Sequence, residues 1–330
     1  MEIWELVGPR ALEMRSRPDP EPEEGDVVVD IACTAVSPGT ELFAYRSGPT
    51  SMMVAPGYLA AGTVRTVGAS VDAGLVGRGV LLSAPHGSVA RVDAAGVTLI
   101  PDGVDFEGAV FTHLAGLGHS CLHSGDYRAG DDVAVVGAGL VGMSTALVAE
   151  MVGARVHVID IDPVRLELPA RLGFEVYDAG SDDVGDAIRS ASVAGPAIVV
   201  DTSGSWAGFD TAVRIARKRS RVCVLGVNRV LPTAETGRAV FDELLTFPAR
   251  FHYEGLRIIG CAGHQRDGDL SRDDWTLGRC RSYLLETMAQ GRLDLTPLVT
   301  ERVSPGDLPR IMERFDAADE RPFGVVIDWR

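Results

Sequence analysis

A glycine-rich turn between a buried strand and a helix restricts the possible folds of this chain more than any other feature. Residues 137–142 read Gly-Ala-Gly-Leu-Val-Gly, follow the apolar run at 133–136 and open a stretch that we predict to be helical over 140–153. The first glycine permits a tight turn, the second lets a pyrophosphate approach the backbone, and the third allows close helix packing. The helix N-terminus adds amide donors and a positive dipole. We therefore predict cofactor contacts from Gly137, Gly139, Leu140, Val141 and Gly142.

An acidic residue stands where a dinucleotide-binding chain needs one. Asp160 ends the next predicted strand, 18 residues beyond Gly142. A carboxylate at that point accepts hydrogen bonds from both ribose hydroxyls of an adenosine, whereas it repels a 2′-phosphate. Arg165, one turn into the following helix, is the basic residue that could offset this repulsion. The sequence favours NAD(H) over NADP(H); the alternative is that the glycines serve packing alone.

The middle of the chain alternates strands and helices. Apolar strand runs at 133, 154, 196, 220 and 256 are separated by helical spacing, which is typical of a Rossmann-type, doubly wound parallel sheet. Ligands of such sheets lie beyond the carboxyl ends of the strands. The turns that end two strands are therefore predicted to face the cofactor through Ser203, Gly204, Gly226 and Val227. Ordinary strand-end turns are the alternative.

The two ends of the chain have a different pattern. Short strand runs at 3–6, 27–32, 61–67, 80–83 and 88–92 come without helical periodicity between them, which indicates a β-rich domain. After the middle segment, helices are predicted at 273–290 and 309–317 and a last strand near 323. We expect this tail to return to the N-terminal domain. The predicted division is 1–128 for the first part of the β-rich domain, 129–262 for the dinucleotide domain and 263–330 for the return.

Composition excludes several classes of protein. The 330 residues carry 31 Lys+Arg and 46 Asp+Glu, a formal charge of −15, which argues against nucleic acid and anionic membranes as partners. The five cysteines show no metal-binding spacing, and no basic and then apolar signal opens the sequence. These features indicate a reducing compartment, so we expect a cytoplasmic protein.

Several short motifs together resemble the medium-chain dehydrogenase/reductase superfamily, the zinc alcohol dehydrogenase-like proteins. They are SPGTE at 37, APGYLAAGTV at 55, IPDGV at 100, GDDVAVVGAGLVG at 130, VIDIDPVRLE at 158, VDTSG at 200 and GRLDLTPLVTERV at 291. The resemblance implies a GroES-like catalytic domain formed by both chain ends, a Rossmann domain between them, and homodimers joined through the Rossmann sheets.

The chain departs from the zinc-bearing members at each metal position. The resemblance aligns Pro38, Tyr58 and Thr112 with their three zinc ligands, and Zn²⁺ requires thiolate, imidazole or carboxylate donors. The four-cysteine lobe for structural zinc is missing as well. We therefore expect no zinc, as in a zinc-independent branch similar to cyclitol and bacteriochlorophyllide dehydrogenases.

Without a metal, a reacting oxygen needs hydrogen-bond donors and a proton source. The resemblance places Thr40, Tyr58 and Thr112 around that oxygen, with Thr40 matching a hydroxyl relay. Tyr58 could donate its phenol proton, or only fill the vacant metal position. His113 could act as acid or base near neutral pH, or be structural. The predicted catalytic residues are Thr40, Tyr58 and His113.

Three more residues are predicted to line the substrate pocket: Glu41, His86 and Thr112. For His86 a solvated loop, and for Glu41 a surface carboxylate, is the favoured alternative. His119 and His123 lie four residues apart, a spacing that can bind metal, but the motif offers no third ligand. We interpret them as packing or surface residues.

The leading functional hypothesis is an NAD(H)-dependent oxidoreductase that interconverts alcohol and carbonyl groups on a small polar substrate, such as a polyol, a sugar or a cyclitol. One alternative is a reductase of activated C=C bonds, against which Asp160 counts because those enzymes often prefer NADPH. The other is a dinucleotide-binding protein without turnover.

Overall fold

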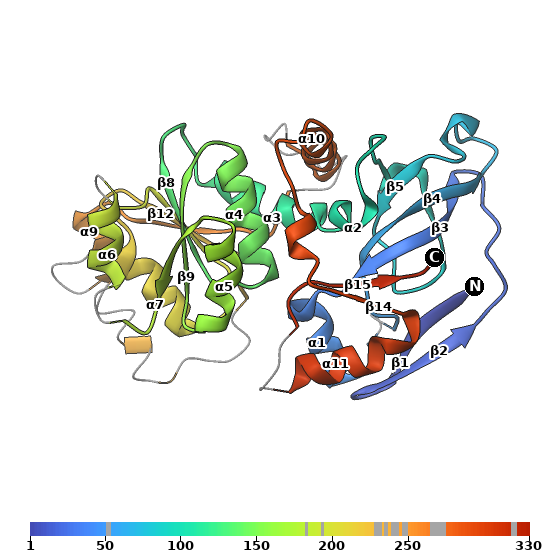
Figure 1. The fold of residues 1–330 in the computed structure, drawn as a ribbon, viewed down its shortest axis with the longest axis horizontal. Helices are drawn as coiled ribbons and strands as arrows, with labels where there is room; N and C mark the ends of the chain where they lie inside the picture. Colours follow the sequence, from blue (N-terminus) through green and yellow to red (C-terminus); the bar gives the residue numbers. More distant parts are fainter. Residues whose placement is uncertain are drawn as a thin grey trace. The chain divides into compact units, whose positions relative to one another are not determined.

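The computed structural model describes residues 1–50, 54–181, 184–192, 195–227, 233, 237–238, 244–245, 250–264, 275–317 and 322–330. The chain forms two compact units, coloured along the sequence in Figure 1. We call Met1–His113 together with Arg266–Arg330 the β unit, and Leu114–Gln265 the Rossmann unit. The two architectures confirm the predicted fold class, a doubly wound parallel sheet plus a β-rich unit built from both chain ends.

The Rossmann unit is built on one six-stranded sheet. Its strands are β8 (Asp132–Val136), β9 (Arg155–Asp160), β10 (Glu175–Asp178), β11 (Ile198–Asp201), β12 (Arg221–Val224) and β13 (Arg257–Gly260). They lie in the order β10-β9-β8-β11-β12-β13, and every neighbouring pair is parallel. The strand order reverses between β8 and β11. Ligands of such sheets bind at this switch point, beyond the carboxyl ends of the strands.

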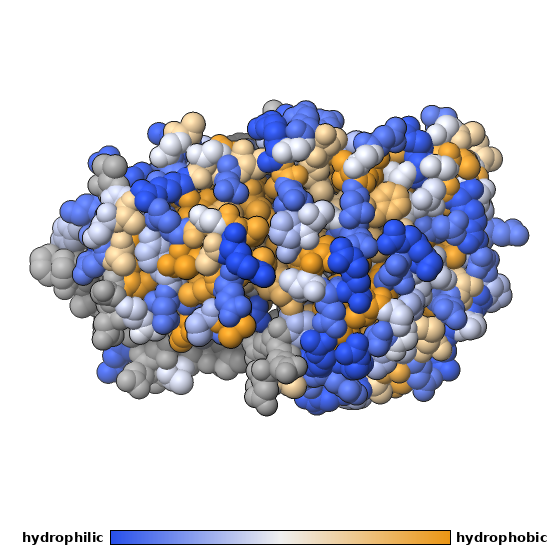
Figure 2. All heavy atoms as spheres, viewed as in Figure 1, coloured by the Kyte–Doolittle hydropathy of each residue, from blue (hydrophilic) through white to orange (hydrophobic). Residues whose placement is uncertain are grey.

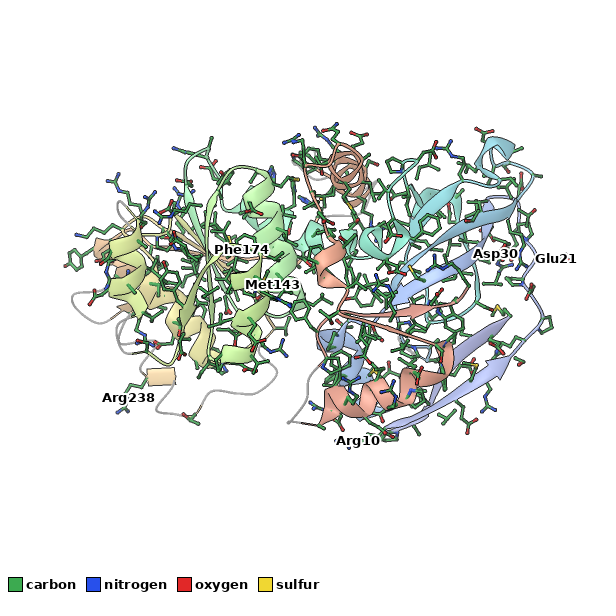
Figure 3. All side chains as sticks on the ribbon, viewed as in Figure 1. Arg10, Glu21, Asp30, Met143, Phe174 and Arg238 are labelled. Carbon is green, nitrogen blue, oxygen red and sulfur yellow. The ribbon has the colours of Figure 1, made fainter. Side chains whose placement is uncertain are left out.

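Helices cover this sheet. They are α4 (Leu140–Met151), α5 (Pro163–Arg171), α6 (Val184–Ala191), α7 (Trp206–Ile215) and α9 (Arg250–Tyr253), joined by α3 (Thr112–Ser124) from Leu114 onward. Met143 of α4, labelled in Figure 3, is fully buried. Gly118 of α3 lies against α4, since a Cβ there would stand 2.6 Å from the Cα of Thr145. This packing places most of α3 with the Rossmann unit.

The β unit combines elements from both chain ends. Its strands are β1 (Glu2–Gly8), β2 (Ala11–Ser16), β3 (Asp26–Ala35), β4 (Leu59–Val67), β5 (Gly79–Leu82), β6 (Val89–Asp93), β7 (Thr98–Leu99), β14 (Glu301–Val303) and β15 (Val325–Asp328). The main sheet has the order β14-β15-β3-β4-β5-β7, β6 also pairs with β3, and β1 and β2 form a separate hairpin. The C-terminal strand β15 runs antiparallel to β3, with Ile327 opposite Thr34.

Short helices complete the β unit. They are α1 (Pro38–Ser47), α2 (Phe106–Ala109), α10 (Leu277–Ala289) and α11 (Leu308–Asp316), with 3-10 turns at Ala73–Leu75, Ala94–Gly96, Thr296–Leu298 and Pro305–Asp307. Of the predicted helix at 273–290, the first two residues lie outside the described part, and the observed helix α10 begins at Leu277, after its N-cap Thr276. Helix α11 follows the prediction at 309–317. Buried residues of α11, including Ile311 and Phe315, pack with Trp4 and Leu6 of β1 in one apolar cluster.

Helix α1 corrects the sequence-based interpretation of the N-terminal segment as strands and turns. Pro38 begins the helix, and Gly48 ends it with φ 82°. Pro at the first helical position and Gly just after the last are the usual helix limits. The pattern between them was weak because polar Glu41 is buried beside Ala44 and Tyr45, which hides the apolar stripe that signals a helix.

The surface exposes both polar and apolar residues. On the face shown in Figure 2, hydrophilic residues alternate with smaller hydrophobic patches. Among the described residues, no helix combines the length and the apolar character needed to cross a bilayer. The apolar run that continues into α4 is divided by the turn at 137–139, so α4 has only 12 residues.

Candidate active site

The glycine-rich turn after β8 is tightly packed. Gly137 has φ 101°, and a Cβ on it would lie 2.8 Å from the Thr202 Oγ1. A Cβ on Gly142 would lie 1.8 Å from the carbonyl oxygen of Gly137, so only glycine fits there. Gly139 has more space around it than these two glycines. The nearest atom to a Cβ built on Gly139 would be Arg165 Nη1, at 3.7 Å. The backbone at Gly139 can therefore be approached closely, as the phosphates of a dinucleotide require.

Helix α4 begins directly behind this turn. Its N-cap is Gly139, which offers no side chain to cap the first amides. The first amides of an α-helix have no partner within the helix, so those of Leu140, Val141 and Gly142 face the turn as donors. The predicted phosphate site thus has free backbone donors, a helix dipole and a neighbouring guanidinium, all of which favour an anion.

Asp160 lies beside the glycine-rich turn, at the end of β9. Its Oδ2 accepts a hydrogen bond from the amide of Ala138 at 2.6 Å, and its Oδ1 accepts one from Asp162 at 2.9 Å. An ionised carboxylate offers about four acceptor positions, so each oxygen keeps one for a ribose hydroxyl. The carboxylate is thereby oriented by the same loop that forms the predicted phosphate site.

The turns after β11 and β12 touch each other. A Cβ on Gly226 would lie 2.4 Å from the amide nitrogen of Gly204, whose φ is 61°. Thr202, which we did not predict as a site residue, donates its hydroxyl to the carbonyls of Val136 at 3.0 Å and Gly137 at 2.9 Å. These contacts join the ends of β8, β11 and β12 at one edge of the sheet.

The side chains of these turns differ in exposure. Ser203 is exposed, and both its amide and its hydroxyl donate to Asp201 Oδ1, at 3.0 and 2.7 Å. Burial raises the pKa of Asp201, whose Oδ2 is buried and has no hydrogen-bond partner among the residues that the structure describes. Val227 is 70% exposed and so is available to contact a bound molecule. Contacts from Ser203, Gly204, Gly226 and Val227 to the cofactor stay predictions.

In the β unit, Glu41 and His86 form a buried pair. Both side chains are 0% exposed, and His86 Nε2 lies 2.8 Å from Glu41 Oε2. The other carboxylate oxygen accepts the amide of Ser37 at 2.7 Å, and His86 Nδ1 is 2.8 Å from Thr34 Oγ1. A solvated loop for His86 and a surface carboxylate for Glu41, which we favoured from the sequence, are therefore wrong. Both are buried groups that need a partner.

A glycine makes room for this pair. Gly57 has φ 99°, and a Cβ on it would lie 2.7 Å from the amide nitrogen of His86. That amide donates to Pro56 at 2.8 Å, which fixes the loop of His86 against the segment before Tyr58. The glycine of the APGY motif therefore serves packing in this unit. Direct contact of Glu41 or His86 with a substrate stays a prediction.

Tyr58 stands between the buried pair and the surface. Its hydroxyl lies 2.7 Å from Ser37 Oγ, and Ser37 donates its amide to Glu41. Burial raises the pKa of Tyr58, while hydrogen bonds with Ser37 and Thr40 act in the opposite direction. The phenol therefore keeps its proton at neutral pH and can donate it. Thr40 is exposed, so the series of hydrogen-bonded hydroxyls that includes Ser37 and Tyr58 reaches the surface of the β unit.

Ser37 is a site residue that sequence analysis missed. It directly precedes Pro38 in the SPGTE motif, and its hydroxyl and amide contact both Tyr58 and Glu41. The available signal was a small hydroxyl residue at the N-cap of a helix. The sequence analysis predicts no helix at this segment, so it does not single out Ser37.

His113 packs edge-on against Tyr58, with the ring centres 5.4 Å apart. Its Nδ1 accepts a hydrogen bond at 3.0 Å from Nη2 of Arg281, a buried residue that the sequence did not indicate. Burial and then the Arg281 charge lower the pKa of His113 to about 4. The imidazole is therefore neutral near pH 7, which suits an acceptor better than the acid we had considered. Its catalytic role stays a prediction.

His113 should make the stability of the chain depend on pH. In the unfolded chain an imidazole titrates near 6.5, whereas His113 in the folded chain titrates near 4. The contribution of neutral His113 to stability is fully present above pH 6.5. It is lost as the pH falls from 6.5 to 4, because in this range only the unfolded chain takes up the proton. We expect His113→Gln to flatten the slope of unfolding free energy against pH in this window by about 1.4 kcal/mol per pH unit. Urea unfolding at several pH values measures it.

A matched variant controls this experiment. His252 is an exposed histidine of the Rossmann unit, so His252→Gln should leave the slope unchanged. Equal slopes for the wild type and His113→Gln would show that His113 takes up its proton at the same pH in the folded and the unfolded chain, so that folding does not lower its pKa.

The three positions aligned with zinc ligands do not form a metal site. Pro38 has no donor atom and begins α1. The Tyr58 hydroxyl is engaged with Ser37, and the fully buried Thr112 donates its hydroxyl to the Met288 sulfur at 3.8 Å. None of these groups is a thiolate, imidazole or carboxylate, which Zn²⁺ prefers. Thr112 thus supports helix α10 in the β unit.

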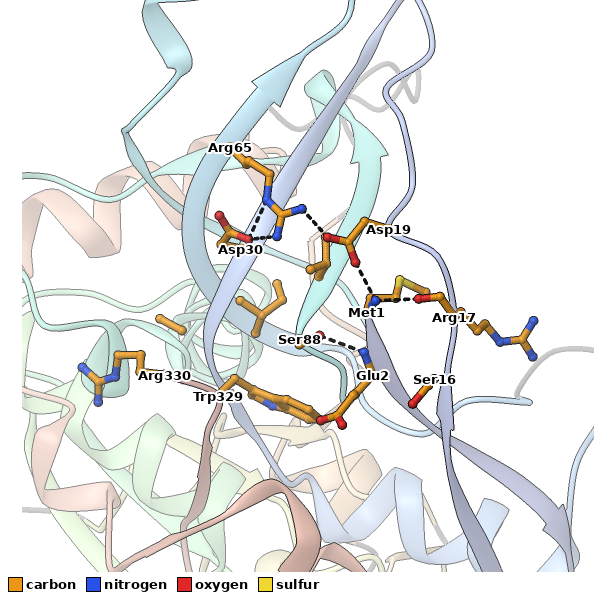
Figure 4. Close-up of a pocket in the computed structure, with 13 residues that line it drawn as sticks. Met1, Glu2, Ser16, Arg17, Asp19, Asp30, Arg65, Ser88, Trp329 and Arg330 are labelled. Carbon is orange, nitrogen blue, oxygen red and sulfur yellow. Dashed lines mark hydrogen bonds and ion pairs between the residues drawn. The ribbon is translucent and has the colours of Figure 1, made fainter.

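A separate pocket of about 590 Å³ lies at the first strands of the β unit (Figure 4). Arg65 extends along it and pairs with Asp30 and with Asp19, the latter at 2.6 Å. The pocket contains no residue that the sequence predicted for cofactor or substrate. The charge of Arg65 is compensated by the carboxylates of Asp30 and Asp19.

The fold and the glycine-rich turn with Asp160 are those of a dinucleotide-binding protein, and relatives named as dehydrogenases indicate an NAD(P)-dependent oxidoreductase. The zinc-binding dehydrogenase family model matches residues 141–274. An L-threonine 3-dehydrogenase of Mesorhizobium japonicum is 29% identical over 96% of this chain and 95% of its own length. Another, from Chelativorans sp., is 32% identical over 71% of this chain and 61% of its own length.

Solved structures share the fold. 2R,3R-butanediol dehydrogenase of Bacillus subtilis superposes with a TM-score of 0.82 over 99% of both chains, at 17% identity. At this identity the likeness concerns the fold alone. Together, the sequence relatives and the fold confirm the resemblance: the chain belongs to the medium-chain dehydrogenase/reductase superfamily of zinc alcohol dehydrogenase-like proteins.

Proposed function

We propose that the chain is an NAD(H)-dependent dehydrogenase that interconverts an alcohol and a carbonyl on a small polar substrate, without a metal ion at the reacting oxygen. The observation that carries this proposal is the Tyr58 hydroxyl, which lies 2.7 Å from Ser37 Oγ. The superfamily resemblance aligns Tyr58 with a zinc ligand of the zinc-bearing members. A protonated phenol can stabilise negative charge on oxygen and supply a proton, the two tasks that a metal-free site requires.

The cofactor part rests on the Rossmann unit. A bound nicotinamide would exchange a hydride with the substrate. The Gly137–Gly142 turn would hold the pyrophosphate, and Asp160 would accept the adenosine ribose hydroxyls. The carboxylate of Asp160, with its two remaining acceptor positions, favours NAD(H) over the phosphorylated form.

The proton part rests on the β unit. Tyr58 would donate its phenol proton to the substrate oxygen, which becomes negative when the carbonyl is reduced. Ser37 would share a hydrogen bond with the Tyr58 hydroxyl, and the exposed Thr40 would complete the hydroxyl relay. The buried Glu41–His86 pair would hold Ser37 in place through its amide. A polar substrate is favoured because hydroxyl groups, rather than apolar side chains, surround this position. Dehydrogenases of L-threonine and of butanediol among the similar proteins agree with a small hydroxylated substrate.

A substrate panel tests the proposal. The purified chain, treated with a metal chelator, is mixed with NADH or NAD⁺ and with polyols, sugars, cyclitols, hydroxy acids, ketones or enones, and nicotinamide absorbance is followed. We expect turnover with a polyol or its ketone and none with enones. Turnover with enones alone would favour a C=C reductase, and NADH binding without any turnover would favour a non-catalytic dinucleotide-binding protein. Turnover that appears only after zinc is restored, in a chelated chain that is still folded and still binds NADH, would contradict a metal-free mechanism.

A further inference from the structure

Three histidines gather in the Rossmann unit. His119 and His123 lie four residues apart on α3, and His264 follows β13. The Nδ1 of His119 is 2.8 Å from the Nε2 of His264, and the ring centres of these two residues are 5.0 Å apart. The ring centre of His123 is 6.0 Å from that of His264. The third imidazole, which the sequence motif lacked, therefore comes from a distant segment.

We infer that His119, His123 and His264 together bind one divalent transition-metal ion, with Zn²⁺ as the ion of best fit. Imidazoles that share a tetrahedral Zn²⁺ at about 2.0–2.1 Å per bond have ring centres about 5 Å apart. The observed 5.0 Å between His119 and His264 matches this value, whereas His123, at 6.0 Å from His264, has to approach by about 1 Å. Their nitrogens would stand about 3.3 Å apart around the ion, so His119 and His264 need to separate by about half an ångström from 2.8 Å.

Backbone contacts bring His264 to α3. Gly263 has φ 90°, and a Cβ on it would lie 2.9 Å from the Leu117 side chain. The positive φ favours glycine at this position, and the close contact shows that the segment before His264 lies against Leu117 of α3. The same segment is tied to the sheet by the amide of Cys261, which donates to Val224 at 2.9 Å. The cluster thus joins two elements that each have a fixed position in the Rossmann unit.

The donor set selects the class of ion. Neutral imidazole nitrogens suit Zn²⁺, Co²⁺, Ni²⁺ and Cu²⁺, whereas Mg²⁺ and Ca²⁺ require oxygen ligands. In the hydrogen-bonded pair one proton lies between His119 and His264. Both rings can present a lone pair to the ion once that proton moves to the outer nitrogen of its own ring, so binding by the neutral pair releases no net proton.

The expected role is structural. An ion held by His119 and His123 on α3 and by His264 after β13 would hold this helix against the strand-end segment. It would stabilise the folded chain by an amount that grows with the logarithm of the free ion concentration above Kd. The inference is independent of the proposed function, because it uses none of Pro38, Tyr58 or Thr112. Chelation should therefore lower stability without removing the catalytic groups.

Cobalt binding tests this site directly. The untagged full chain is freed of metal with a chelator and titrated with Co²⁺, while the visible absorption of tetrahedral cobalt, the metal content after dialysis and the Tm are measured; Zn²⁺ is then added in competition. We expect about one equivalent of Co²⁺, displaced by Zn²⁺, and a Tm that rises with the ion. His119→Gln and His264→Gln should each weaken binding at least about 100-fold.

Two further variants keep the test decisive. His123 is exposed, so His123→Gln should fold normally and still weaken binding and shift the cobalt spectrum. His252→Gln, at an exposed histidine outside the cluster, should bind cobalt like the wild type. The inference is wrong if the wild type takes up no cobalt, or if one equivalent remains bound with the same spectrum in all three cluster variants.

Discussion

Replacing Asp160 with serine should reverse the cofactor preference of this chain. The carboxylate is placed by the Ala138 and Asp162 amides so that one acceptor position on each oxygen remains for a ribose hydroxyl. Hydrogen bonds to a charged acceptor contribute about 1.5–3 kcal/mol each, so NADH should bind about 100-fold more weakly. The serine also removes the repulsion of a 2′-phosphate, and Arg165 beside Gly139 then supplies a cation for it. We expect the ratio of NADH to NADPH affinity to fall about 1,000-fold.

Fluorescence titration of NADH and NADPH measures both affinities. Asp160→Asn removes the charge but keeps an acceptor for the loop, because the side-chain oxygen of asparagine can still accept the hydrogen bond from the Ala138 amide. This variant should relieve the repulsion of the 2′-phosphate and lose less NADH affinity than Asp160→Ser. Asp162→Ser is the matched control, since Asp162 caps α5 through the Val164 amide at 3.0 Å and lies two residues from the ribose position. An unchanged preference in Asp160→Ser would mean that the ribose site is elsewhere.

Replacing Tyr58 with phenylalanine should lower kcat about 100- to 10,000-fold, the usual contribution of a general acid. The ring and its contact with His113 would remain, while the hydroxyl that faces Ser37 would be lost. The KM should change less than kcat, because the proton is needed most in the transition state. Steady-state kinetics with the substrate found in the panel measure this effect, and NADH binding should stay normal.

Tyr45→Phe provides the control for a buried tyrosine. Tyr45 is 4% exposed and packs with Trp4 and the α11 residues of the β unit. Its substitution should leave kcat unchanged, so a fall in both variants would indicate a general effect on folding. If Tyr58→Phe retains full kcat, the phenol does not supply the proton, and Thr40 or a water molecule becomes the candidate donor.

The dinucleotide half of the site was largely predictable. The glycine-rich turn, the helix behind it and Asp160 lie within 24 residues, so their arrangement follows from one strand-turn-helix-strand segment. Five of the six strands of the parallel sheet were predictable as well, because each contains an apolar run. Strands such as β2, β10 and β14 were missed: they are short and only partly buried, so they lack an apolar run.

For the substrate part of the candidate site, the sequence predicted which residues take part but not how they are buried and paired. The superfamily resemblance indicated Tyr58, Thr40 and His113 by position, yet it could not show which of their neighbours are buried. Glu41 was expected on the surface, but its partner His86 comes from a loop 45 residues away. Arg281, which together with burial makes His113 neutral, lies 168 residues from it.

The amino-acid sequence alone determined the fold class, the cofactor turn and the absence of ligating side chains at the three zinc positions, because these depend on neighbouring residues and on residue chemistry. Only the tertiary structure decided which ionisable groups are buried and paired, including the approach of His264 to His119 across 145 residues. Burial and pairing change the charge and reactivity of a side chain, and they arise from contacts between segments that local sequence patterns do not relate.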